Sequence, residues 1–71
     1  MEMVEIMGSS RIAAIGHDRD TLELEIEFVD GGTYVYGDVP RTVFDALKSA
    51  GSPGRYLDSY IKPRYQFYKK S

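Results

Sequence analysis

Tyr34 and Tyr36 are the residues of this sequence whose type and spacing best suit a binding site. They stand in the run Thr33-Tyr34-Val35-Tyr36, whose β-branched and aromatic residues predict a strand. Residues two positions apart on a strand share one face. The two rings could therefore stack on successive unpaired bases of a nucleic acid, at about 1–3 kcal/mol per base. Alternatively, both rings pack beneath a helix and only their hydroxyl groups reach the rim.

The C-terminal segment, residues 55–70, interleaves basic and aromatic side chains and is the second candidate. Basic groups would contact phosphates and the rings would stack on bases. Alternatively, Tyr56, Tyr60 and Phe67 belong to the core, and the basic residues are solvated or pair with an acidic strand. From the two candidate segments we predict eight nucleic-acid contacts: Tyr34, Tyr36, Arg55, Tyr60, Lys62, Arg64, Tyr65 and Lys69.

Other chemistry has weaker support. The run Ser52-Pro53-Gly54-Arg55 could hold an anion at a helix N-terminus, although ordinary capping explains it equally well. The single histidine, His17, stands in a run with turn composition and has no partner at a spacing typical of a metal site or a catalytic triad. A chain of 71 residues leaves little room for the pocket of roughly 300–1,000 Å³ that small molecules use. We therefore expect no catalytic residues, no metal and no cofactor.

The charge is divided between the two halves of the chain. Residues 1–40 carry nine acidic and two basic residues, whereas residues 41–71 carry seven basic and two acidic residues. The division predicts either a basic side that meets an anion or an internal match between an acidic sheet and a basic tail. The net charge of −2 argues against strong nonspecific binding to nucleic acid.

Composition fits a small cytoplasmic domain. Residues 1–71 are long enough for one domain, include no cysteine and are 42% hydrophobic, so packing alone must stabilise the fold. No apolar run approaches the roughly 20 residues that a membrane helix needs. The N-terminal residues lack the basic and apolar parts of a secretory signal. We expect no membrane association.

The clearest structural pattern is the alternation of Leu22, Leu24, Ile26 and Phe28 with three glutamates, which predicts a half-buried strand over 21–29. A shorter strand is expected over 10–17, followed by a turn over 17–20. Asp30-Gly31 predicts a hairpin to the strand 33–36. A two-residue loop would put the tyrosines on the glutamate side, whereas a three-residue loop with a bulge would put them in the core.

The second half of the chain predicts two short helices. Asp38 is the expected cap of the first, which has its apolar residues at helical spacing up to Ala50 and ends at Gly51. The second begins at Ser52 and ends before Pro63, and residues 65–68 could form a closing strand, with 69–71 frayed. The predicted fold is α+β: an antiparallel meander of three, possibly four, strands with the helix pair on one face, in a single domain whose core spans residues 9–68.

An ordered set of residues resembles the KTSC domain, a small domain found at the C-terminus of some lysyl-tRNA synthetases and as a stand-alone bacterial protein. The set covers residues 9–65 and consists of Phe28, Gly31, Tyr34, Tyr36, Val39 and Pro40, then Phe44, Leu47, Ala50, Ser52, Gly54, Tyr56, Ile61 and Tyr65. The resemblance implies a domain of unestablished function, and the attachment to a synthetase implies RNA as its ligand. We predict a non-enzymatic domain that binds RNA such as tRNA; the alternative is a protein-interaction or homodimerisation module.

Overall fold

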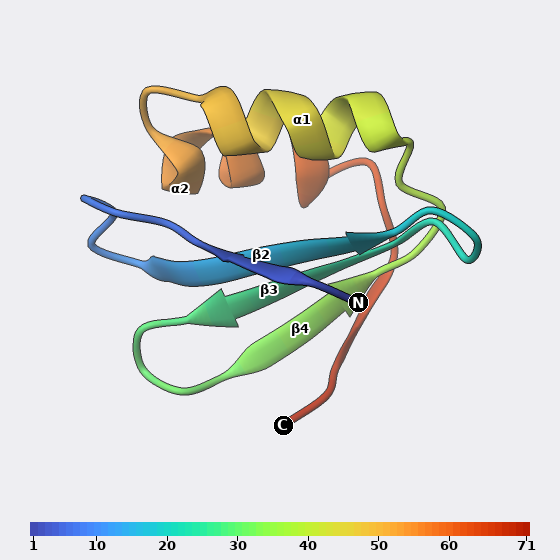
Figure 1. The fold of residues 1–71 in the computed structure, drawn as a ribbon, viewed down its shortest axis with the longest axis horizontal. Helices are drawn as coiled ribbons and strands as arrows, with labels where there is room; N and C mark the ends of the chain where they lie inside the picture. The colour runs from blue at the N-terminus through green and yellow to red at the C-terminus, as the bar shows by residue number, and fades with distance from the viewer.

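A five-stranded antiparallel sheet carries all helical segments on one of its faces (Figure 1). The computed structural model describes residues 1–71. The strands are β1 (Met3–Glu5), β2 (Ile12–Asp18), β3 (Glu23–Phe28), β4 (Thr33–Tyr36) and β5 (Phe67–Lys69), and they neighbour one another in chain order. The helices α1 (Arg41–Ser49), α2 (Pro53–Tyr56) and η1 (Leu57–Ile61) lie between β4 and β5 in the chain. The α+β class is confirmed, with more strands than the three or four predicted.

The loop between β3 and β4 decides on which face the tyrosines lie. Phe28 N–H donates to the Gly32 carbonyl at 2.8 Å, which leaves a three-residue loop with Gly31 in the left-handed region at φ 98°. Ile26 therefore pairs with Tyr34 and Leu24 with Tyr36. Directly paired residues share a face, so both tyrosines lie on the apolar face of the sheet.

The core forms between this apolar face and the helices. The sheet contributes Ile12, Ile15, Leu24, Ile26 and Tyr36, each at most 1% exposed, and the segment from residue 39 onward contributes Val39, Phe44, Leu47, Leu57 and Ile61. Leu57 and Ile61 belong to η1, one turn of π-helix in which Lys62 N–H donates to the Leu57 carbonyl five residues back, at 2.9 Å. Its buried side therefore faces the sheet, while Asp58 and Lys62 lie on its exposed side.

Three local predictions were wrong. His17 lies in β2 rather than in a turn; it is 6% exposed, stacks on Phe44, and its Nε2 lies 2.6 Å from the Val39 carbonyl oxygen. Leu22 is left-handed at φ 60° and 38% exposed, because the turn extends to it. Asp38, also left-handed, does not cap α1, whose N-cap is Pro40 without a side-chain hydrogen bond.

The two ends of the chain are more ordered than the sequence indicates. The N-terminal strand β1 pairs with β2, with Val4 opposite Ile15, and no pattern in the sequence predicted it. At the other end, Lys69 belongs to β5, and Lys70 and Ser71 hydrogen-bond with the backbone of Thr33. The C-terminal residues are therefore held by the sheet and not frayed. None of the helices has the length and apolar content that a membrane span requires.

Candidate nucleic-acid interface

An open groove of about 610 Å³ lies on the helix side of the sheet, toward the β3–β4 loop. The helices leave part of the sheet face uncovered there, so the depression is an open groove and not an enclosed small-molecule pocket. We call this the aromatic groove. Four rings line it, Phe28, Tyr34, Tyr36 and Phe67, together with three cations, Arg11, Lys62 and Lys69, and one carboxylate, Asp30.

The register of the last two strands brings the rings together. Tyr34 pairs with Lys69 and Tyr36 with Phe67, so all four side chains lie on the same face. The Phe67 ring centroid lies 5.5 Å from that of Tyr34 and 5.3 Å from that of Tyr36, and Phe28 meets Tyr34 edge-on at 5.6 Å. These separations are typical of favourable aromatic contacts. Phe67 remains 54% exposed, so the cluster offers a free ring surface to a ligand.

Tyr36 lies at the base of this cluster. Its side chain is 1% exposed, and burial raises the pKa of its hydroxyl group above the ordinary value. The ring therefore stays uncharged at neutral pH and contributes apolar surface. Tyr36 is part of the core and at the same time supports the Phe67 ring above it.

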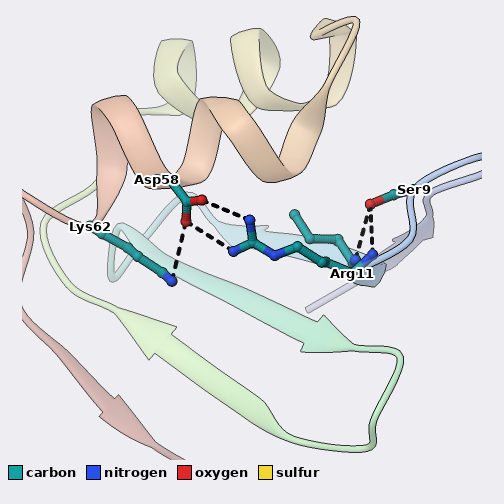
Figure 2. Close-up of polar contacts among 5 residues, drawn as sticks. Ser9, Arg11, Asp58 and Lys62 are labelled. Atoms are coloured by element: carbon teal, nitrogen blue, oxygen red, sulfur yellow. Dashed lines mark hydrogen bonds and ion pairs between the residues drawn. The ribbon is translucent and has the colours of Figure 1, made fainter.

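The Arg11–Asp58–Lys62 cluster lies beside the groove (Figure 2). Arg11 Nη1 donates to Asp58 Oδ2 at 2.7 Å and Nη2 to Oδ1 at 2.9 Å, while Lys62 Nζ lies 3.2 Å from Oδ1. Ser9 Oγ accepts hydrogen bonds from the backbone N–H groups of Arg11 and Ile12, which fixes the start of β2. The cluster joins η1 to the sheet across 47 positions of sequence.

The charge cluster predicts a dependence of stability on pH. The hydrogen bond from Arg11, followed by that from Lys62, holds the pKa of Asp58 far below its ordinary value. Because the folded pKa is depressed, the stabilisation is fully present above the unfolded value of about 3.9 and is lost as the pH falls below it. Urea unfolding at a series of pH values should show this acid loss in the natural sequence and a smaller one in Asp58→Asn. An equal loss in both proteins would contradict the assignment.

The comparisons with known proteins decide the family. The family model described as KTSC domain matches residues 8–65. This chain belongs to the KTSC domain family. The crystal structure of a KTSC domain protein from Yersinia pestis matches with a TM-score of 0.92 and 38% identity, covering 99% of this chain and 97% of that one. The resemblance drawn from the sequence is therefore confirmed.

Two kinds of relative share this KTSC domain. A protein from Tsukamurella paurometabola is 43% identical over 58 residues, which are 82% of this chain and 87% of the relative. A lysine–tRNA ligase from Nostoc punctiforme is 34% identical over 62 residues, 87% of this chain and 11% of the ligase. The domain therefore occurs in proteins of its own size and as a small part of a much longer enzyme.

The KTSC domain brings four of the eight predicted contacts into one groove: Tyr34, Tyr36, Lys62 and Lys69. The other four lie elsewhere. Tyr60 is exposed and contacts Tyr56 outside the groove, with tilted rings whose centroids are 4.9 Å apart, and both Tyr56 and Tyr65 pack against the core. Arg55 lines a neighbouring polar pocket and Arg64 is exposed outside the groove.

Among the aromatic and basic residues that line the groove, three were not predicted: Phe28, Phe67 and Arg11. Phe28 and Phe67 stand in segments that were singled out, and the face they share with the tyrosines follows only from the three-residue loop and from the β4–β5 register. Arg11 carries no signal in the sequence, because its partner Asp58 is remote in the chain. Long-range pairing of this kind leaves no periodic pattern.

The acidic strand of the KTSC domain points away from the groove. Glu25 and Glu27 pair with Val35 and Thr33, and these residues face the side of the sheet opposite to the tyrosines. Lys70 Nζ lies 3.1 Å from Glu25 Oε1 and is the one basic tail residue with an ion pair to that strand. The repulsion that three glutamates would exert on an anion is therefore directed to the other face.

A shallow apolar trough of about 520 Å³ lies toward the β1 edge of the KTSC domain. Its lining includes the small side chains of Ala13 and Ala14 and the apolar side chains of Met3, Met7 and Val29; Met7 is 87% exposed. The charged residues that line it are Glu5 and Glu27. Its chemistry is therefore the opposite of that of the aromatic groove.

Proposed function

We propose that this KTSC domain is a non-enzymatic module that binds single-stranded RNA in the aromatic groove. One observation carries the proposal: the strand register puts Tyr34, Phe67 and Lys69 on one face of the sheet, with the glutamates of β3 on the other. Unpaired bases would stack on the exposed Phe67 ring and on the half-buried Tyr34 ring, and backbone phosphates would meet the cations at the groove wall. Stacking of this kind tolerates many base sequences.

The occurrence of a homologous domain in lysine–tRNA ligases supports RNA as the ligand class. The enzyme's name refers to a tRNA substrate, and tRNA has unpaired bases in its loops and at its 3′ end. We extend this inference to the present chain and include tRNA among its expected ligands. We also infer a cytoplasmic location for this domain, in keeping with that ligand class.

A titration of the amide NMR spectrum with a short mixed RNA pool and with tRNA tests the proposal. Shifts are expected in β4, β5 and residues 62–69, and the apparent affinity should fall between about 50 and 200 mM salt, because binding to phosphates releases counterions. The double variant Lys62→Glu with Lys69→Glu should abolish the shifts. Arg19→Glu with Lys48→Glu makes the same change of charge outside the groove and should retain them.

Circular dichroism of both double variants shows whether each is folded before the RNA titrations are compared. Shifts that persist in the groove variant would mean that RNA does not bind in the groove. An absence of shifts in the natural sequence at millimolar RNA would reject RNA binding altogether.

A second candidate function, the binding of a protein segment, is favoured by the apolar trough. Strand β1 is an edge of the sheet, so its outer backbone groups can pair with an extended segment. Because Glu5 and Glu27 are the charged residues of the trough, the expected segment alternates apolar and basic side chains. A peptide of alternating valine and lysine should shift the amide signals of β1 without those of β5. An unchanged spectrum would reject this candidate.

A further inference from the structure

We propose that Arg11 and Lys62 form the phosphate subsite of the aromatic groove, and that Asp58 occupies this subsite until a phosphate group of the RNA displaces it. The inference rests on the proposed function and names the part of the ligand that this corner of the groove recognises. It also gives Asp58 a role beyond joining η1 to the sheet.

The geometry of the cluster is the first argument. A guanidinium group binds a carboxylate and a phosphate with the same pair of parallel hydrogen bonds. Arg11 makes this pair with the two oxygens of Asp58, at 2.7 and 2.9 Å, and Lys62 Nζ approaches the same carboxylate at 3.2 Å. Two phosphate oxygens could take the places of Oδ1 and Oδ2 without a rearrangement of either cation.

Accessibility is the second argument. The side chains of Arg11, Asp58 and Lys62 are 42%, 46% and 47% exposed, so an anion from solvent can reach both cations. Solvent screens an ion pair this exposed, so a phosphate can compete with the carboxylate for both cations. Figure 2 shows the two cations reaching Asp58 from different elements, with Arg11 at the start of β2 and Lys62 after η1.

The position of the cluster is the third argument. Arg11 and Lys62 line the aromatic groove, whereas Asp58 does not; it lines the polar pocket on the other side of Arg11. A phosphate would enter from the groove and take the place of the carboxylate between the two cations, while Asp58 withdraws toward the polar pocket. Arg11 and Lys62 line the same groove as the aromatic rings, so one nucleotide could contact both the cations and the rings.

The displaced carboxylate has a measurable consequence. In the natural sequence, Asp58 must give up its two cations and take counterions from solvent when the phosphate binds. In a variant without the Asp58 charge, no displaced carboxylate takes up counterions. The salt dependence of RNA binding would then reflect all the counterions that the RNA releases. Asp58→Asn should therefore bind RNA about three- to tenfold more tightly at 50 mM salt, the effect of one unit charge a few ångströms away.

The experiment compares Asp58→Asn with two control variants by fluorescence anisotropy of a labelled oligonucleotide at several salt concentrations. Asp45→Asn removes a carboxylate that pairs with Arg41 on α1, away from the groove. Asp20→Asn removes an exposed carboxylate in the turn between β2 and β3, outside the groove. We expect the plot of log affinity against log salt to be steeper by about 0.7 in Asp58→Asn alone.

The outcomes separate this inference from the proposed function. If the double variant Lys62→Glu with Lys69→Glu no longer binds RNA, while Asp58→Asn has the affinity and salt dependence of its controls, RNA binding in the groove is supported and the phosphate subsite is rejected. If RNA does not bind the natural sequence, both proposals fail.

A second measurement uses the natural sequence and needs no folded variant. The carbon-13 signal of the Asp58 carboxylate should move on addition of RNA, since the carboxylate exchanges two cationic partners for water. The signal of the Asp45 carboxylate should stay in place. An Asp58 signal that is unchanged at saturation would overturn the inference.

Discussion

Replacement of both Tyr34 and Phe67 by alanine is expected to weaken RNA binding by at least about 30-fold. The two rings lie 5.5 Å apart on the same face, and Phe67 is 54% exposed, so together they offer stacking surface for two bases. Each stacked base contributes about 1–3 kcal/mol, and 2 kcal/mol corresponds to about 30-fold in affinity. Anisotropy of a labelled oligonucleotide at about 50 mM salt, where phosphate contacts are strong, measures the change.

The control for this variant is the replacement of Tyr56 and Tyr60 by alanine. These two rings also contact each other, at 4.9 Å, but they lie outside the groove, so the RNA affinity should remain within about twofold, less than one stacked base contributes. The conservative exchange Tyr34→Phe with Phe67→Tyr keeps both ring faces and should bind RNA nearly as well as the natural sequence. Equal losses in the groove variant and the control variant would show that the effect is structural and not due to stacking.

Replacement of Tyr36 by alanine should have the largest effect on stability. The side chain is 1% exposed and belongs to the core cluster. Loss of a buried aromatic ring costs about 3–5 kcal/mol, whereas a domain of this length has a total free energy of unfolding of about 4–10 kcal/mol. A large part of the Tyr36→Ala protein should therefore be unfolded at room temperature. Urea unfolding followed by circular dichroism measures the loss.

Tyr36→Phe distinguishes the ring from its hydroxyl group. It keeps the buried ring, so its free energy of unfolding should stay within about 1 kcal/mol of the natural value, the usual net contribution of a single hydrogen bond. A Tyr36→Ala protein as stable as the natural sequence would contradict the placement of this ring in the core.

The two tyrosines differ in burial, although they stand two positions apart on one strand. Tyr36 lies where η1 and α1 cover the sheet, and Tyr34 lies closer to the uncovered hairpin, where its ring is half-buried. The extent of the helical layer along the strand thus separates a core position from a position that is open to the groove. A single substitution at Tyr34 should lower the RNA affinity more than the stability of the fold. A single substitution at Tyr36 should mainly lower the stability.

The Arg11–Asp58–Lys62 cluster has a similar double role. Its ion pairs join η1 to β2, and two of its three members line the aromatic groove. Residues that hold the helical layer in place thereby also set the charge of the groove. This arrangement explains how a chain with a net charge of −2 can present cations to an anionic ligand.

The sequence by itself determined the features that depend on neighbours close in the chain. The alternation of Leu24, Ile26 and Phe28 with glutamates specifies a two-faced strand, and helical spacing of apolar residues specifies the two helical segments, because side-chain periods of two and of about 3.6 are local properties of the backbone. The ordered motif around Tyr34 and Tyr36 was sufficient to identify the family, and the KTSC family model matches residues 8–65.

Only the tertiary structure decided which face the tyrosines share and what surrounds them. One additional residue in the β3–β4 loop moves every side chain of β4 to the other face, and the sequence allowed both loops. The pairing of β5 with β4 and the contact of Arg11 with Asp58 join segments more than 30 positions apart. Such contacts depend on how the packed layers meet, which no local pattern in the chain records.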